Sequence, residues 1–199
     1  MNRLKFISSL LLIFLYVHIQ PALAQSSLRF SSEFYTNGNG DTLRYRKLTP
    51  DADTLRRYPL VIFLHGSGER GNDNEAQLKW GVMNFAIDEN MRLHPAFVIA
   101  PQCPAKMMWA NFSREKNSTE MQLQSSPTKP MELLIDLIHQ LIKNLPVDSN
   151  RIYITGLSMG GSGTYDAIGR YPKLFAAAVP VCGSADVSKV DVIAHLPIW

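Results

Sequence analysis

The spacing of apolar and polar residues near the start of the chain predicts an antiparallel hairpin. Residues 28–36 and 42–48 each alternate loosely between apolar and polar side chains, which is typical of strands with one buried face. The residues between them, 37–41, read Asn-Gly-Asn-Gly-Asp, and such a run between two strand patterns indicates a tight turn. We therefore expect two paired strands at the start of a sheet.

Continuous apolar runs further along the chain predict a parallel core. Residues 59–64, 97–100 and 175–181 are apolar almost throughout, as strands buried on both faces are. Residues 151–155 are mostly β-branched or aromatic and predict a fourth strand. The last residues, 196–199, have the pattern of the first residues of a further strand.

Helices are predicted between these strands, where apolar residues recur every three or four positions. The pattern is strong at 131–144 and weaker at 75–89, and a helix entry is expected at 161–170. His139 falls on the polar side of the predicted helix 131–144, so we do not expect it to carry chemistry. Together the elements indicate an α/β fold.

Residues 105–130 lack a clear period and are rich in Ser, Asn, Lys and Met. A long irregular segment inside a compact domain is commonly functional or mobile. We interpret it as a loop near the mouth of a site. Trp109 and Phe112 are its candidate substrate-facing aromatics, with simple packing as the equal alternative.

The first 24 residues have the pattern of a signal peptide. Arg3 and Lys5 precede an apolar run at 6–19, and the segment ends in a small-x-small motif at Ala24, which a signal peptidase recognises. Cleavage after Ala24 leaves residues 25–199 as an exported protein, periplasmic or extracellular. An uncleaved anchor is the alternative, but the apolar run is short for a membrane span.

Composition narrows the function classes. The chain has 199 residues with 46% hydrophobic content, which suits one well-cored domain over 25–199. Its formal charge of +3 falls close to neutral once the signal peptide is removed. Without a basic patch with interleaved aromatics, we expect no nucleic acid partner. We also expect no metal, no cofactor and no stable membrane anchor after cleavage, and the oligomeric state is left open.

Residues 156–160 read Gly-Leu-Ser-Met-Gly directly after the predicted strand 151–155 and fit the G-x-S-x-G nucleophile elbow. A serine hydroxyl that stands clear of a sheet needs a tight strand-to-helix turn, so its neighbours two before and two after must lack bulk. Gly156 and Gly160 meet that need, which makes Ser158 the candidate nucleophile; a plain glycine-rich turn is the alternative. The turn also directs the backbone N–H of Met159 towards a developing oxyanion.

A second glycine-rich loop, 65–71, follows the predicted strand 59–64. It leaves backbone N–H groups uncovered, and those of Gly66 or Ser67 are candidates for the other half of an oxyanion hole. A phosphate-binding loop is excluded because no Gly-Lys-Ser/Thr follows. We interpret His65 as a residue that shapes this loop rather than as the catalytic base.

The order of these elements resembles that of the α/β-hydrolase fold, and the chain is similar to exported esterases and predicted peptidases related to polyhydroxybutyrate depolymerases and feruloyl esterases. The closer likeness is carried by 65–71, 100–104, 150–161 and 180–183. The resemblance implies a mostly parallel sheet with an N-terminal antiparallel hairpin. It also implies that Ser158 forms an acyl-serine intermediate, with an oxyanion hole from Met159 and from Gly66 or Ser67.

The resemblance further implies an acidic residue after the next strand and a histidine after the one beyond. The sequence ends at Trp199 before either position, so we interpret the chain as the N-terminal part of a hydrolase, truncated before its last strands, and expect it to be nearly inactive. Asp186, which follows the predicted strand 175–181, is a candidate acid. His195 precedes a strand and is disfavoured as the base.

These observations favour a carboxylic-ester hydrolase that acts on a small-molecule or carbohydrate-linked ester. A serine peptidase is an alternative because the same site attacks amides, and a non-catalytic binding protein on the same scaffold is another. The expected sheet order separates Cys103 from Cys182 by two central strands. That is further than the about 7 Å a disulfide spans, so we expect free thiols.

Overall fold

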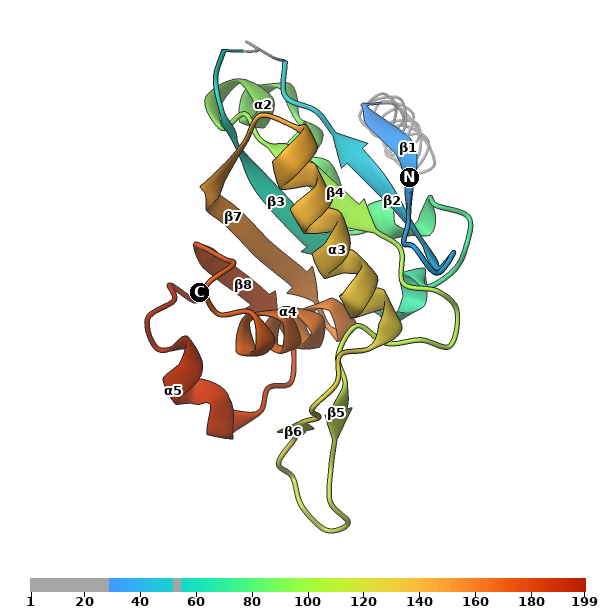
Figure 1. Cartoon of the computed structure of the whole chain (residues 1–199), viewed down its shortest axis with the longest axis vertical. Coiled ribbons are helices and arrows are strands. Elements are labelled where there is room, and N and C mark those ends of the chain that lie inside the picture. The colour runs from blue at the N-terminus through green and yellow to red at the C-terminus, as the bar shows by residue number, and fades with distance from the viewer. Residues whose placement is uncertain (1–28, 52–54) are drawn as a thin grey trace, which may run out of the picture.

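A six-stranded sheet organises residues 29–51 and 55–199, which are the residues described in this computed structural model (Figure 1). Its strand order is β1-β2-β4-β3-β7-β8. The strands are β1 (Phe30–Thr36), β2 (Thr42–Leu48), β3 (Tyr58–Leu64), β4 (Phe97–Pro101), β7 (Val147–Leu157) and β8 (Ala177–Val181). The predicted signal peptide, residues 1–24, lies outside the described residues.

The N-terminal hairpin is confirmed. β1 and β2 pair antiparallel from Phe30 opposite Leu48 to Thr36 opposite Thr42. The side chain of Asn37 closes the turn, because its Oδ1 accepts the backbone N–H of Asp41 at 2.9 Å. β2 then pairs antiparallel with β4 and joins the hairpin to the rest of the sheet.

The four strands β4, β3, β7 and β8 are parallel to one another, which confirms the mostly parallel α/β arrangement. Leu60, Ile62 and Leu64 of β3 are fully buried, as the continuous apolar run predicted. The carboxyl ends of parallel strands lie at one edge of the sheet, so the loops after β3, β4, β7 and β8 share that edge.

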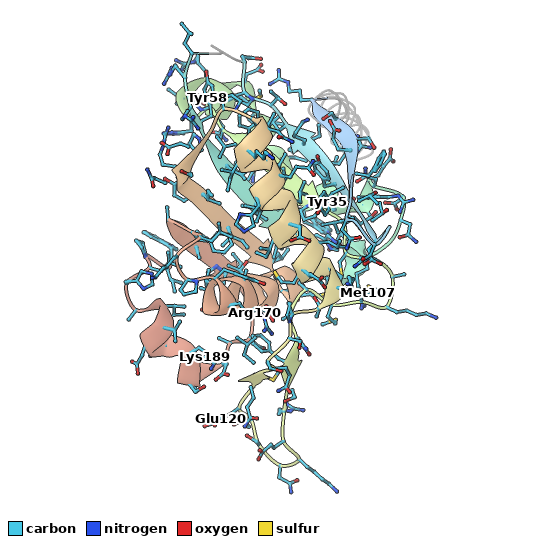
Figure 2. All side chains as sticks on the ribbon, viewed as in Figure 1. Tyr35, Tyr58, Met107, Glu120, Arg170 and Lys189 are labelled. Atoms are coloured by element: carbon cyan, nitrogen blue, oxygen red, sulfur yellow. The ribbon has the colours of Figure 1, made fainter. Side chains whose placement is uncertain are left out.

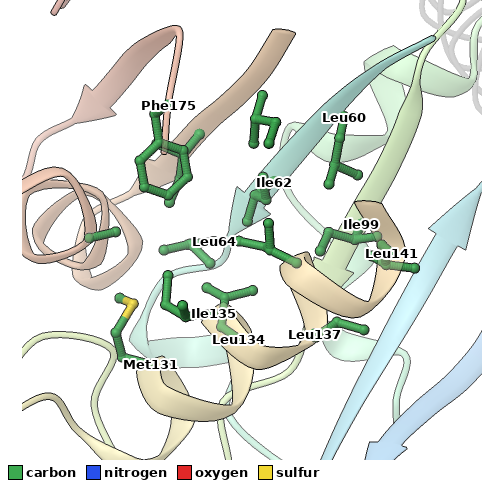
Figure 3. Close-up of a cluster of buried hydrophobic side chains, with 14 of the residues drawn as sticks. Leu60, Ile62, Leu64, Ile99, Met131, Leu134, Ile135, Leu137, Leu141 and Phe175 are labelled. Atoms are coloured by element: carbon green, nitrogen blue, oxygen red, sulfur yellow. The ribbon is translucent and has the colours of Figure 1, made fainter. Parts of the chain in front are cut away.

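Helix α3 (Lys129–Asn144) covers one face of the sheet (Figure 1). Thr128 caps its first turn, with its Oγ1 accepting the N–H of Met131 at 3.3 Å. Figure 3 shows the core between the helix and the sheet, where apolar side chains of α3 such as Leu134 and Leu137 meet those of β3 and β4. The predicted helix 131–144 is therefore confirmed, and His139 lies on its exposed face.

The predicted helix 75–89 is wrong. The chain there forms two short 3₁₀ turns and a small helix, η2 (Ala76–Leu78), η3 (Val82–Ala86) and α2 (Asp88–Leu93). Gly81 separates the turns with a φ of 80°, a left-handed conformation that a continuous right-handed helix cannot contain. A Cβ at Gly81 would lie 3.1 Å from the ring of Phe63, so tertiary packing holds the break in place.

Residues 105–130 are largely irregular, as predicted, but contain a small two-stranded ribbon, β5 (Phe112–Ser113) with β6 (Gln122–Leu123). This ribbon projects from the body of the domain (Figure 1). After α4 (Met159–Arg170) and β8, the chain forms η4 (Val187–Lys189) and α5 (Val190–Ile193).

Residues 197–199 lie along the outer edge of β8. Ile198 forms a parallel bridge with Ala178, and the N–H of Trp199 donates to the carbonyl of Ala178 at 3.1 Å. This pairing agrees with the strand start predicted at 196–199. Among the described residues, no helix combines the length and apolar character that a membrane span requires.

Candidate active site

Ser158 lies at the turn between β7 and α4, and its backbone is strained. Its φ of 55° and ψ of −111° fall in a region that costs a non-glycine residue of the order of 1–3 kcal/mol. The turn is held by two hydrogen bonds, from the N–H of Ser158 to Val181 O at 2.8 Å and from the N–H of Ser162 to Ser158 O at 3.0 Å. The residue is exposed, and its hydroxyl bonds to no described residue.

Gly156 and Gly160 leave the space that the turn needs. A Cβ at Gly160 would lie 1.9 Å from the carbonyl oxygen of Leu64, and one at Gly156 would lie 2.3 Å from the carbonyl oxygen of Gly160. Both clashes are with backbone atoms, which cannot shift without a large cost in free energy. The elbow geometry therefore follows from close packing of β3, β7 and the start of α4, as the motif predicted.

The loop after β3 lies against Ser158. Gly66 is extended and precedes the 3₁₀ turn η1 (Ser67–Glu69), and a Cβ built on Gly66 would lie 3.9 Å from Cβ of Ser158. The backbone N–H groups of Gly66, Ser67 and Met159 donate to no acceptor among the described residues. Gly66 and Met159 are buried, and buried N–H groups without an acceptor are rare. The arrangement can therefore accept a negatively charged oxygen in front of Ser158.

His65 holds this loop in shape. It is 2% exposed, its Nε2 accepts the N–H of Cys103 at 2.9 Å, and its Nδ1 lies 2.6 Å from the carbonyl oxygen of Gly66. This pairing places the ring proton on Nδ1, which donates to Gly66. Burial lowers the pKa of His65, so the ring stays neutral. With both nitrogens occupied, His65 shapes the loop as expected and is not available as a base.

The structure corrects the suggestion that Trp109 faces the substrate. Trp109 is fully buried, its Nε1 donates to the carbonyl of His65 at 3.2 Å, and its Cβ would lie 2.5 Å from a Cβ at Gly163. It therefore packs behind the loop after β3, against α4. Phe112 is half-buried on β5, and its role as a substrate-facing residue stays a prediction.

Asp186 forms hydrogen bonds with neighbouring segments, and its suggested role as the catalytic acid stays a prediction. Its Oδ1 accepts the hydroxyl of Ser188 at 2.6 Å and caps η4, and its Oδ2 accepts the N–H of Leu123 at 2.8 Å. These bonds, led by the one from Ser188, lower the pKa of Asp186. No described histidine contacts it; His195 lies with its Nε2 3.1 Å from the carbonyl oxygen of Pro172.

Gln102 and Asp73, which the sequence motifs did not single out, support the loop after β3 through hydrogen bonds. Nε2 of Gln102 donates to Oδ1 of Asp73 at 2.7 Å and to the backbone carbonyl of Glu69 at 3.2 Å. Oδ1 of Asp73 also accepts two backbone N–H groups, of which that of Ala76 contributes most to lowering the pKa of the carboxyl. Gln102 lies in one of the motifs that carry the resemblance, but only its contacts reveal what it does.

The described residues contain no group of three or more His, Cys, Asp and Glu side chains that could hold a metal ion. Cys103 and Cys182 are free thiols, and the strands that precede them, β4 and β8, are separated by β3 and β7 as predicted. Cys103 is buried, and burial raises its pKa to about 12. Cys182 is exposed.

Known proteins with similar sequences and structures are hydrolases. The model of the family described as phospholipase/carboxylesterase matches residues 52–190. The crystal structure of a thermostable esterase is 42% identical, with a TM-score of 0.79, over 88% of this chain and 46% of that chain. A bifunctional acetylxylan esterase/xylanase of Neocallimastix patriciarum is 25% identical over 125 residues, 63% of this chain and 16% of that protein.

A third relative, poly(3-hydroxyalkanoate) depolymerase C of Paucimonas lemoignei, is 27% identical over 128 residues, 63% of this chain and 28% of that protein. The matched regions thus cover less than a third of either curated relative. They cover less than half of the esterase structure.

Proposed function

This chain belongs to the phospholipase/carboxylesterase family, and from that membership we propose that it hydrolyses carboxylic esters with Ser158 as the nucleophile. The observation that carries the proposal is the pair of buried, unused N–H groups of Gly66 and Met159 beside the exposed hydroxyl of Ser158. Unpaired N–H groups of this kind are stabilised when an oxygen of the substrate accepts hydrogen bonds from them.

In the proposed reaction, Oγ of Ser158 attacks the ester carbonyl carbon and the carbonyl oxygen becomes an oxyanion. The N–H of Met159 and the N–H of Gly66 or Ser67 donate hydrogen bonds to that oxygen. Collapse of the tetrahedral intermediate breaks the bond to the alcohol, which leaves with a proton, and an acyl-serine remains. Water then releases the acid and regenerates Ser158. One such donor is worth roughly 10²–10³ in kcat.

The serine proton needs a base, and the described histidines do not supply it. Both nitrogens of His65 are engaged, and His94, His139 and His195 make no contact with Ser158. A serine without a base is a poor nucleophile. On the described residues alone, we therefore expect slow turnover of esters.

The substrate class in this proposal is a small-molecule or carbohydrate-linked ester. The names of two relatives, an acetylxylan esterase and a poly(3-hydroxyalkanoate) depolymerase, both denote hydrolysis of esters. Export after cleavage at Ala24 would give the enzyme access to extracellular esters of this kind. N-terminal sequencing of the secreted protein should then begin at Gln25.

Covalent labelling tests the nucleophile without requiring turnover. Because the probe needs the same activated hydroxyl, a fluorophosphonate in excess should label the chain slowly at Ser158, and this labelling should be lost in Ser158→Ala. Ser149→Ala is the matched control, because Ser149 is exposed near the opposite end of the same strand. Peptide mapping that places the label on another residue would overturn the proposal.

Steady-state assays test the reaction class. Hydrolysis of 4-nitrophenyl acetate should be serine-dependent and faster than hydrolysis of the matched 4-nitroanilide. A preference for the anilide would indicate a peptidase. Activity that persists in Ser158→Ala would exclude this site.

A further inference from the structure

A buried carboxylate lies beside the nucleophile and has no partner in the described part of the chain. Glu69 is 7% exposed, yet its side chain forms no hydrogen bond and no ion pair with any described residue. Neither the sequence motifs nor the proposed mechanism gives it a role. Carboxylates are seldom buried without a partner, because desolvation of the charge is costly.

The carboxylate lies close to the turn that holds Ser158. A Cβ built on Gly66 would lie 3.1 Å from Oε2 of Glu69 and 3.9 Å from Cβ of Ser158. The carboxylate and the nucleophile therefore approach the same side of Gly66. Nε2 of Gln102 donates a hydrogen bond to the backbone carbonyl of Glu69. This bond fixes the turn to which the Glu69 side chain is attached.

Neighbouring charged groups do not neutralise Glu69. Arg70 points elsewhere, since its Nε donates to the carbonyl of Ser67 at 2.9 Å and its Nη1 donates to the carbonyl of Met107 at 3.2 Å. His65 is neutral, because its pKa is lowered by burial. The Glu69 carboxylate is therefore unpaired within the described residues and open to a group that enters the site.

The negative charge of a carboxylate determines which kind of substrate group Glu69 can bind. A carboxylate repels an oxyanion, so Glu69 does not take part in the oxyanion hole. It accepts hydrogen bonds, and hydrogen bonds to a charged acceptor are stronger than those between neutral groups. A hydroxyl or ammonium group on the substrate would supply the missing partner.

We propose that Glu69 is a specificity residue that selects esters carrying a hydroxyl or ammonium group near the scissile bond. The inference rests on the proposed esterase function and names a feature of its substrate. An ester without such a donor offers the carboxylate no hydrogen-bond partner, and loses that contribution to binding in the transition state.

Isosteric esters test the proposal directly. Propyl butyrate has no donor, 2-hydroxyethyl butyrate has a neutral one and 2-ammonioethyl butyrate has a cationic one. Methyl isovalerate and methyl 3-hydroxybutyrate make the same comparison on the acyl side. In Glu69→Gln we expect kcat/KM for a donor-bearing ester to fall about 10-fold or more, while the donor-free ester changes less than about 3-fold.

Glu89→Gln is the control for loss of a negative charge, because Glu89 is exposed on α2, which lies at the far end of the sheet (Figure 1). Circular dichroism should show that both variants are folded. An equal loss on all esters in Glu69→Gln would indicate a purely structural residue and overturn the proposal, as would no change on any of them. The hydroxyl and ammonium arms identify which donor is preferred.

Equilibrium binding separates this proposal from the esterase assignment. Calorimetric titration of the same esters into Ser158→Ala should show tighter binding of a donor-bearing ester, and Glu69→Gln in that background should remove the preference. No preference in Ser158→Ala would refute the role of Glu69 even if Ser158 is the nucleophile. A preference that depends on Glu69 would support it even if ester hydrolysis did not depend on Ser158.

Discussion

Replacement of Asp166 by alanine should destabilise the domain far more than the loss of an exposed ion pair. Asp166 is fully buried in α4, and its carboxylate accepts Nε of Arg170 at 2.7 Å and the backbone N–H of Asn111 at 2.8 Å. Arg170 also donates to the carbonyl of Ser125 at 3.0 Å, where α4 meets the irregular segment (Figure 2). Asp166 therefore ties residues 105–130 to the helix that carries Ser158.

The expected loss of unfolding free energy follows from the two donors that Asp166→Ala would leave without an acceptor. The side chain of Arg170 is 9% exposed, so Asp166→Ala strands a mostly buried guanidinium and a backbone N–H without their acceptor. Removing one partner of a buried pair costs about 3–5 kcal/mol, a large share of the roughly 5–15 kcal/mol that stabilises a domain. For a chain of this size the melting temperature should fall by about 6–20 °C.

The chain contains a matched control for this change. Asp148 bonds Arg151 over the same 2.7 Å, but both side chains are partly exposed, at 28% and 45%. Exposed pairs contribute roughly 0–1 kcal/mol. Urea unfolding of Asp166→Ala and Asp148→Ala measures the difference, and equal free energies of unfolding for the two variants would refute the reasoning.

Three further predictions follow from the same structure. Gly160→Ala should abolish fluorophosphonate labelling and lower the melting temperature, because its Cβ would meet a backbone oxygen at 1.9 Å. The pKa of Asp186 is lowered in the fold, so its contribution to stability is present above its ordinary pKa of about 4 and is lost as pH falls below it. Urea unfolding at pH 6 and pH 3 should therefore show a smaller acid-induced loss of unfolding free energy in Asp186→Ala than in the unmutated chain. Native thiol titration should count Cys182, which is exposed, and should detect Cys103, whose pKa is raised to about 12, only after unfolding.

The main elements of the fold could be predicted from local pattern. The apolar run at 59–64 and the helical spacing at 131–144 each repeat a signal many times within one segment, so single exceptions do not obscure it. The elbow around Ser158 could be predicted because the clearance it needs comes from neighbours in the sequence, Gly156 and Gly160. Periodicity and tight turns are local, so the sequence by itself determined them.

The roles of individual side chains depended on contacts between distant segments. Gly81 breaks the helix predicted at 75–89 where the ring of Phe63 lies against it. The buried indole N–H of Trp109 donates a hydrogen bond to the backbone carbonyl of His65, which lies 44 positions away in the sequence. Glu69 lies in the motif 65–71, but the motif gives its side chain no role, and only the packing around Gly66 shows that its carboxylate is buried near Ser158. Burial and hydrogen-bond partners are properties of the assembled fold, so only the tertiary structure decided which polar residues support the site and which are free to bind a substrate.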